Sequence, residues 1–386
     1  MSTTDTIPNT VLASATDPNG TPQPPPSSST TTRRTSQRRP LLTRFRFWIK
    51  IWLMKSMTTL LFKVMRLANR RKLRPFLPDY TKRYDVRPHL ENRIFIPRNN
   101  TTTTTTSNLS PQKYPLLITI HGGGFALCDP TIDDEINRHF ADLHSFVVVS
   151  VDYQKSPAVY FPETVHDAGA VVSSVIEDPG LPVDASRGVT VAGFSAGGNL
   201  ALAVAQLPDV KDKIRSVVPF YPVVDFTGLY KGEYRDRPAV TAPDGTSTTK
   251  PTPDMLKNLG PLFDWAYINP GTDLTDPLLS PVFATRSRLP QRIFFVTAEY
   301  DYLCHEAEVM ARKLAGFDDY ATITWTPGAG TGGRGSHWEQ NGVRWRMVPD
   351  VTHSWTHMPL KDVEEEKKRR GHLVVLYKEV ADWLKQ

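Results

Sequence analysis

Cysteine is almost absent from this chain of 386 residues, which contains only Cys128 and Cys304. Secreted proteins of this size often carry several disulfides, so the low count favours a reducing compartment. Residues 1–40 are polar throughout, and we therefore expect no secretory signal in that stretch. Together these features predict a cytoplasmic location.

Acidic residues are missing from Thr31 to Phe76, a stretch rich in Arg and Lys. The whole chain has a net charge of only +6, so the remainder of the chain is net acidic. Basic charge confined to one segment, without basic and aromatic residues interleaved elsewhere, argues against a nucleic-acid-binding surface. We expect no nucleic-acid partner.

An uninterrupted hydrophobic run is lacking too, because the most apolar stretch, residues 41–66, contains Arg and Lys at several positions. A membrane-spanning helix needs about 20 apolar residues with few or no charges. At about 100° per residue, Arg44, Lys55, Lys63 and Arg66 fall on one side of a helix. The pattern therefore predicts a basic amphipathic helix.

Two interpretations of this helix remain open. Its apolar face could pack on the globular domain, as a lid over the active site. Alternatively, it could lie on a membrane such as the endoplasmic reticulum or another lipid surface, with Trp48 and Trp52 at the interface and the basic residues toward anionic lipid. The two interpretations are compatible, and a signal anchor is a third.

Patterns typical of metal and cofactor sites are also missing. The histidines are scattered, without the H-x-x-x-H or C-x-x-C spacing of a zinc site. The sequence contains neither a phosphate-binding loop nor a dinucleotide fingerprint. We expect no metal and no cofactor.

The composition changes along the chain and divides it into three parts. Residues 1–40 are rich in Ser, Thr and Pro and are predicted to be a disordered tail. Residues 41–76 form the basic helical segment, and residues 77–386 form the main domain. A cap insertion at about 225–285 is expected within this domain, including a polar loop at 242–253.

Short aliphatic runs alternate with helical patterns through the main domain, which predicts a mostly parallel sheet with helices on both faces. The fold class is therefore α/β. The strands are expected at 115–120, 146–151, 188–193, 216–220, 292–297 and 321–325, and the helices at 163–176, 199–206, 306–314 and 361–385.

Gly193-Phe194-Ser195-Ala196-Gly197 is a G-x-S-x-G pentapeptide between a predicted strand and a predicted helix. This is the setting of a nucleophile elbow, where a sharp turn exposes the serine at the sheet edge. The glycines are needed because side chains beside such a turn would clash. The pattern predicts Ser195 as a nucleophile; the alternative is a simple Gly/Ser turn.

His121-Gly122-Gly123-Gly124-Phe125 follows the strand that ends at Ile120. Consecutive glycines allow backbone N–H groups to approach a substrate oxygen. Gly122, Gly123, Gly124 and Ala196 are therefore predicted to form an oxyanion hole, with His121 in a structural role. The alternative is a flexible glycine loop.

With these two motifs the chain resembles the hormone-sensitive-lipase-like group of α/β-hydrolases, which combines an HGGG loop with a G-x-S-A-G-G-N elbow. The resemblance extends over roughly 116–359 and includes further segments in the family's order. They are Val151-Asp152-Tyr153, Phe161-Pro162, His166-Asp167-Ala168, Asp276 to Pro281, Ala298 to Leu303 and His353 to His357.

The resemblance implies an α/β-hydrolase fold in which Asp301 is the catalytic acid and His353 the base. The order Ser195, Asp301, His353 is the one expected for this fold. The imidazole takes the serine proton, and the carboxylate fixes its tautomer. Asp301 could instead cap the following helix, and His357 or His337 could replace His353.

Two features depart from the family pattern. Phe194 stands inside the elbow where an acidic or small residue is common. Residues 328–342 look like an insertion before His353, so the strand preceding the base is either Ala321–Trp325 or Val343–Met347.

We predict hydrolysis of a carboxylic ester through an acyl-enzyme, with a short or medium acyl ester or a lipophilic metabolite ester as the small-molecule substrate. An amidase or deacetylase with the same triad is one alternative. A non-catalytic ligand receptor on the same fold is another, although the presence of all three triad residues argues against it. Phe125, Phe194, Phe263 and Trp265 could line an apolar pocket or belong to the core. The oligomeric state is not predicted.

Overall fold

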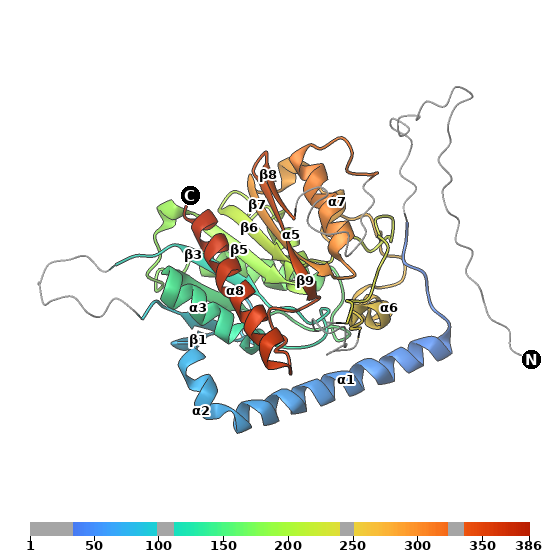
Figure 1. The fold of residues 1–386 in the computed structure, drawn as a ribbon, viewed down its shortest axis with the longest axis horizontal. Coiled ribbons are helices and arrows are strands. Elements are labelled where there is room, and N and C mark those ends of the chain that lie inside the picture. Colours follow the sequence, from blue (N-terminus) through green and yellow to red (C-terminus); the bar gives the residue numbers. More distant parts are fainter. Residues whose placement is uncertain (1–33, 99–111, 240–250, 323–335) are drawn as a thin grey trace, which may run out of the picture. The chain divides into compact units, whose positions relative to one another are not determined.

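The computed structural model describes residues 34–98, 112–239, 251–322 and 336–386, and these form one nine-stranded sheet with helices on both faces (Figure 1). The strand order is β1-β2-β4-β3-β5-β6-β7-β9-β8. The six central strands run parallel to one another; they are β4, β3, β5, β6, β7 and β9. Strands β1, β2 and β8 are antiparallel to their neighbours. The predicted α/β class is confirmed. The strands are β1 Tyr80–Lys82, β2 Asn92–Phe95, β3 Leu116–Ile120, β4 Val147–Val151, β5 Val189–Phe194, β6 Ile214–Phe220, β7 Arg292–Tyr300, β8 His337–Gln340 and β9 Val343–Thr352.

Helices α4, α5 and α7 cover one face of the sheet, and α3 and α8 cover the other. A further helix, α6, lies in the predicted cap insertion between β6 and β7. The α-helices are α1 Leu41–Ala68, α2 Arg70–Leu73, α3 Asp134–His144, α4 Glu163–Ile176, α5 Ala196–Val204, α6 Leu256–Tyr267, α7 Cys304–Ala315 and α8 Val363–Leu384.

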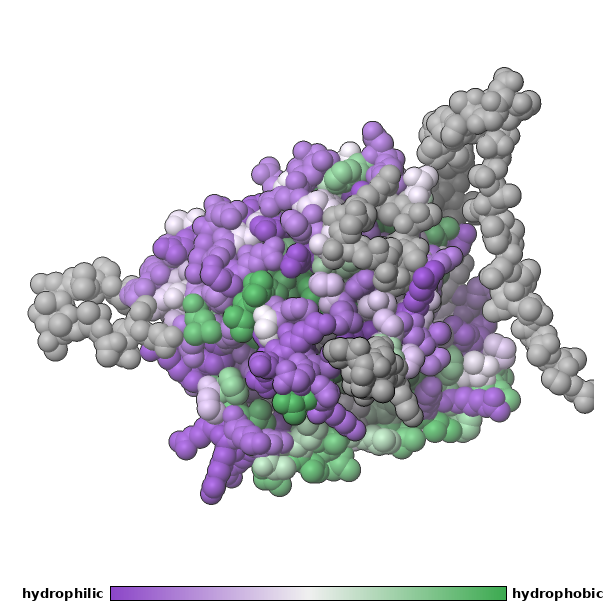
Figure 2. Space-filling view, viewed as in Figure 1, coloured by the Kyte–Doolittle hydropathy of each residue, from purple (hydrophilic) through white to green (hydrophobic). Residues whose placement is uncertain are grey.

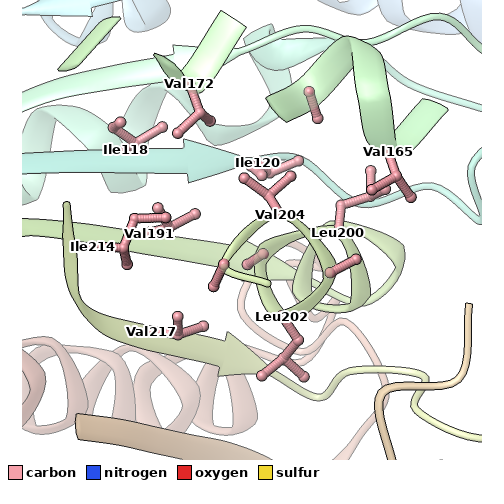
Figure 3. Close-up of a cluster of buried hydrophobic side chains, with 14 of the residues drawn as sticks. Ile118, Ile120, Val165, Val172, Val191, Leu200, Leu202, Val204, Ile214 and Val217 are labelled. Atoms are coloured by element: carbon pink, nitrogen blue, oxygen red, sulfur yellow. The ribbon is translucent and has the colours of Figure 1, made fainter. Parts of the chain in front are cut away.

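The central strands are buried on both sides, and their side chains alternate between two cores. In β3, Ile118 and Ile120 point toward the core under α4 and α5, whereas Leu117 points toward α3 and α8. Figure 3 shows the first core, where Ile120 lies near Val165 of α4 and Leu200 of α5, and Ile118 lies near Val172 of α4. Continuous Val/Ile/Leu runs therefore form these strands because both faces are covered.

Strand β9 settles the open choice of the strand before His353. The structure selects Val343–Met347, which lies within β9, where Val343 and Trp345 are fully buried beside β7. The expected strand at 321–325 is wrong at its start, because Ala321 and Thr322 are exposed residues in a turn; residues 323–325 lie outside the described part. Residues 328–335 of the predicted insertion at 328–342 also lie outside the described part. Residues 336–342 of the insertion contain β8 and the turn that leads into β9.

The N-terminal boundary needs one correction. The predicted disordered tail, 1–40, reaches too far, because Ser36 donates its backbone N–H to Thr272 (2.9 Å) and Leu274 donates to Arg34 (2.8 Å). These backbone bonds hold residues 34–36 in place. Residues 1–33 lie outside the described part, and so does most of the polar loop predicted at 242–253. The predicted helix at 41–66 is present as α1.

Among the described residues, none of the helices combines the length and apolarity needed to cross a bilayer. Cys128 and Cys304 are free thiols.

The packing of α8 on the sheet gives a testable stability prediction. Trp383 is 1% exposed and contacts Phe294 of β7 edge to face, with ring centroids 5.4 Å apart. Removing so large a buried side chain leaves a cavity, so we expect Trp383→Ala to lower the free energy of unfolding by about 3–5 kcal/mol in urea titrations. Val374→Ala is the matched control on the same helix, because Val374 is 58% exposed; its effect should stay within about 0.5 kcal/mol. Equal effects would contradict this packing.

Candidate active site

Ser195 lies at the turn between β5 and α5, in a strained backbone conformation. Its φ is 55° and its ψ is −117°, a region that non-glycine residues rarely adopt. Its N–H donates to the carbonyl oxygen of Phe220 at the end of β6 (2.9 Å), which holds the turn against the neighbouring strand. The side chain is thereby raised above the carboxyl edge of the parallel sheet.

The two glycines of the pentapeptide are required by close backbone contacts. A Cβ on Gly193 would lie 2.0 Å from the carbonyl oxygen of Gly197. A Cβ on Gly197 would lie 2.0 Å from the carbonyl oxygen of Ile120 in β3. Both distances are far below any van der Waals contact, so no other residue fits at either position without moving backbone.

Three buried side chains form a continuous hydrogen-bonded chain above this turn. His353 Nε2 lies 2.8 Å from Ser195 Oγ, and His353 Nδ1 lies 2.8 Å from Asp301 Oδ2. Asp301 follows β7 and His353 follows β9, so adjacent parallel strands deliver both residues to the same edge of the sheet. All three side chains lie in the protein interior, at most 8% exposed.

The geometry separates the alternatives considered for the acid and the base. Asp301 Oδ1 also accepts the backbone N–H of Leu303 (2.8 Å), so the carboxylate both orients His353 and supports the start of α7. His357 instead points Nε2 at Asp133 (2.7 Å), and His337 lies on β8. Of the three histidines, His353 is the one placed against Ser195.

A second buried carboxylate, Asp254, stands beside the chain and was not predicted from the sequence. It precedes α6 and accepts backbone N–H groups from Leu256 and Tyr302, each at 2.8 Å. Burial and the charge of Asp301 raise the pKa of Asp254 to about 6. No motif marks this residue, because it lies in the cap segment, far in sequence from both triad loops.

The electrostatics around His353 favour its protonated form. Burial by itself lowers the pKa of the imidazole, but the charge of Asp301, the hydrogen bond to it and the charge of Asp254 outweigh burial. The net result is a His353 pKa above its ordinary value of 6.5. Such an environment stabilises the imidazolium that forms when the serine gives up its proton.

The glycine loop runs beside Ser195, as expected of an oxyanion hole. A Cβ on Gly122 would lie 2.8 Å from the carbonyl oxygen of Phe194, and Gly123 and Gly124 have φ of 117° and 59°. Ala196 is the first residue of α5, so its N–H has no acceptor within the helix. Gly124, Ser195 and Ala196 line the same cavity.

His121 is completely buried beneath this loop and does not face the cavity. Its ring stacks on Tyr153 with centroids 4.5 Å apart, and its Nδ1 donates to the carbonyl oxygen of Gly122 (2.7 Å). This arrangement fits the structural role proposed for it.

The cavity above Ser195 is mainly apolar. Its lining includes the aromatic rings of Phe125, Phe226 and Phe263, and its charged groups come from Asp225, Lys231, Lys257, Asp264 and Glu306. Two of the four aromatic residues considered for the pocket therefore line it. Of the other two, Phe194 stacks on Phe220 (centroids 4.7 Å apart) behind the site, and Trp265 packs on Phe47 of α1.

One group of residues among those described could hold a metal ion, namely Asp254, Asp301 and His353, whose ligand atoms lie within 4.8 Å of one another. Both nitrogens of His353 already face Asp301 and Ser195. A metal at this position would have to break the hydrogen bond between His353 and Asp301, so the residues fit proton transfer better than metal binding.

A family model described as the alpha/beta hydrolase fold matches residues 117–330, more than half of the chain. The chain belongs to this family. Membership agrees with the resemblance to the hormone-sensitive-lipase-like group, which is thereby confirmed.

Several curated relatives share part of the sequence. An arylesterase of Saccharolobus solfataricus is 33% identical over 202 residues, covering 52% of this chain and 61% of the relative. An arylacetamide deacetylase of Oryctolagus cuniculus is 39% identical over 131 residues, covering 31% and 32%. Neutral cholesterol ester hydrolase 1 of Rattus norvegicus is 37% identical over 117 residues, covering 28% of each chain. The chain thus spans less than two thirds of each of these relatives.

Solved structures share the fold over most of the chain. An esterase of Pyrobaculum calidifontis superposes with a TM-score of 0.59 at 23% identity, covering 90% of this chain and 98% of the other. A thermophilic carboxylesterase from a metagenomic library, EstE1, gives 0.52 at 26% identity, covering 77% and 84%.

The position of Asp254 predicts a shift in pH dependence. Deprotonation of Ser195 requires neutral His353, so the rate at which a fluorophosphonate probe labels Ser195 should fall toward low pH with a midpoint above 6.5, the ordinary value of a free imidazole. Asp254, with a pKa of about 6, is largely ionised at that midpoint and stabilises the imidazolium. Asp254→Asn removes this charge, which lowers the pKa of His353 and moves the midpoint to lower pH.

The matched control is Asp236→Asn, a half-exposed carboxylate in the same segment that pairs with Lys257 (3.8 Å). The control should leave the midpoint where it is. An unchanged or higher midpoint in a folded Asp254→Asn protein would contradict the assigned electrostatics.

Proposed function

We propose that the protein hydrolyses carboxylic esters through an acyl-enzyme, with Ser195 as nucleophile, His353 as general base and acid, and Asp301 as the residue that orients the imidazole. The observation that carries the proposal is the unbroken chain from Asp301 through His353 to Ser195, ending at a cavity. The esterase and ester hydrolase names of several relatives support the same chemistry.

Each step follows from the positions of these atoms. Ser195 Oγ attacks the ester carbonyl carbon while its proton passes to His353 Nε2, 2.8 Å away. The negative charge on the carbonyl oxygen is met by the N–H groups of Gly123, Gly124 and Ala196, assisted by the N-terminus of α5. When the carbon–oxygen bond to the alcohol breaks, the imidazolium returns its proton to the leaving alcohol.

Deacylation repeats the sequence with water. His353 takes a proton from the water as it attacks the acyl carbon, and the proton then returns to Ser195 Oγ as the acid leaves. Asp301 keeps the proton of Nδ1 in place throughout, because its Oδ2 accepts that hydrogen bond. No residue outside the described site is needed to balance protons.

The cavity lining points to a lipophilic substrate. Phe125, Phe226 and Phe263 offer aromatic surface to an acyl or aryl group close to Ser195. A short or medium acyl ester, or an ester of a lipophilic metabolite, fits this environment. We also propose that the protein is cytoplasmic and contacts a lipid surface peripherally through residues 41–66.

An amide-cleaving or deacetylase activity is the second candidate, and one observation favours it. An arylacetamide deacetylase is 39% identical over 131 residues. Because esters and amides pass through the same tetrahedral and acyl-enzyme states, the triad serves both. Comparing kcat/KM for an aryl acetate and the matching aryl acetamide decides between them: a higher value for the acetamide would favour the deacetylase.

The direct test is labelling by a fluorophosphonate probe. The wild-type chain should be labelled, and Ser195→Ala should abolish labelling because the attacked oxygen is gone. His353→Ala should reduce it by a factor of roughly 10³ or more, because the serine loses its base. His357→Ala is the matched control, since this histidine faces Asp133 and not Ser195. A folded wild-type chain that stays unlabelled would refute the proposal and favour the non-catalytic receptor.

A further inference from the structure

The side of α1 that faces away from the protein is covered by large hydrophobic side chains. Soluble monomers rarely expose continuous apolar surface of this extent unless it binds something. Figure 2 shows the hydrophobic residues gathered along the lower edge of the molecule, where α1 runs in Figure 1. We call this surface the outer face of α1; it consists of Leu42, Phe45, Ile49, Trp52, Leu53, Met57, Leu60, Leu61, Val64 and Leu67, which are 38–74% exposed.

Contacts on the opposite side fix the helix in this orientation. Phe47, Ile51 and Met54 pack with Leu262 and Phe263 of α6, and Ile51 is fully buried. Because this inner side is already used for packing, α1 cannot turn its outer face inward without exposing a second apolar cluster. The two interpretations of α1 therefore concern different faces of the helix. Packing on the domain uses the inner side, and lipid binding would use the outer face.

Two of the basic residues expected to face lipid point toward the protein instead. Lys55 donates to the carbonyl oxygen of Ser156 (2.7 Å), and Arg66 pairs with Asp129 (3.0 Å). The membrane interpretation of the sequence placed them on the lipid side, because they share one side of the helical wheel. That side is the one held against the domain by these polar contacts.

Other basic residues are exposed along α1 and at its two ends, where they complement an anionic surface. Arg46, Lys50 and Lys63 are exposed along α1, and further arginines and lysines stand at both of its ends. Their long side chains can extend past an apolar face to reach phosphate groups. The end clusters are Arg38 and Arg39 before the helix, and Arg70, Arg71, Lys72 and Arg74 after it.

The charge also argues against a second copy of the chain as the occupant. Residues 31–76 contain no Asp or Glu, so two outer faces brought together would oppose positive charge with positive charge. An anionic lipid surface instead attracts each of these basic residues. The exposed hydrophobic side chains and the exposed basic residues of this segment together match a bilayer interface.

We propose that the outer face of α1 is a docking surface for an anionic lipid bilayer, with α1 lying in the plane of the membrane. The helix has 28 residues, which corresponds to a length of about 42 Å. Side chains of the outer face would enter the boundary between headgroups and acyl chains, a depth of about 5–10 Å for helices of this kind.

This docking places the active-site cavity close to the lipid and indicates a substrate class. Phe263 packs with Ile51 of α1 in one cluster and also lines the cavity that contains Ser195. One layer of side chains therefore separates the docked helix from the site. We assign esters dissolved in the bilayer as the substrates that docking favours. This assignment rests on the proposed ester hydrolysis.

The test is flotation of the full chain with vesicles, combined with two ester assays. Vesicles of phosphatidylcholine containing phosphatidylserine should carry the wild-type protein to the top of the gradient, and vesicles of phosphatidylcholine alone should carry less. Ile49→Glu, Leu53→Glu and Leu60→Glu together should reduce the bound fraction roughly tenfold or more, because three charges enter the apolar face. Leu143→Glu, Val374→Glu and Val375→Glu form the matched control, at positions 58–64% exposed outside α1; this variant should bind as the wild type does.

Hydrolysis of a water-soluble aryl ester should be the same in all three proteins, whereas hydrolysis of a long-chain ester held in anionic vesicles should fall with binding in the α1 variant alone. Failure of the wild type to float, or equal flotation of the α1 variant, would overturn the proposal. So would a concentration-dependent dimer that the α1 variant abolishes, which would identify a second copy as the occupant. Flotation without hydrolysis of either ester would leave the docking surface standing and refute the proposed function.

Discussion

The strained turn at Ser195 depends on backbone contacts so close that only glycine fits beside it. Gly197 lies against the carbonyl oxygen of Ile120, and Gly193 lies against the carbonyl oxygen of Gly197. A Cβ on either glycine would lie only 2.0 Å from that oxygen. These contacts lock the parallel strands β3 and β5 and helix α5 into one fixed geometry. The serine, the N–H of Ala196 and the glycine loop after β3 then share one edge of the sheet. His353 and Asp301 reach the same edge because β7 and β9 are adjacent.

The parts of the site carried by local motifs could be predicted from the sequence. A G-x-S-x-G turn between a strand and a helix specifies its own backbone, so Ser195 and Ala196 were predictable from five residues. Buried parallel strands were recognisable because they are aliphatic throughout. The strand before His353 was harder: β9 alternates buried with half-exposed residues and carries several charged side chains, so it lacked the pattern of its neighbours.

Features set by contacts between distant segments were not predictable. Asp254 acts on His353 through space from the cap segment, and no local pattern marks a residue for that position. The direction of α1 is a similar case. A helical wheel shows which residues share a side, but the hydrogen bond of Lys55 to Ser156 and the packing of Ile51 on α6 decide which side faces the protein.

The proposed mechanism requires that Ser195 becomes acylated during turnover. Rapid quenching of the reaction with an activated aryl ester, followed by peptide mass spectrometry, tests it most directly. The peptide that contains Ser195 should gain the mass of the acyl group within the first turnover, at a rate matching release of the aryl alcohol. Release of the alcohol with no mass gain on that peptide, or a gain on another residue, would contradict the account.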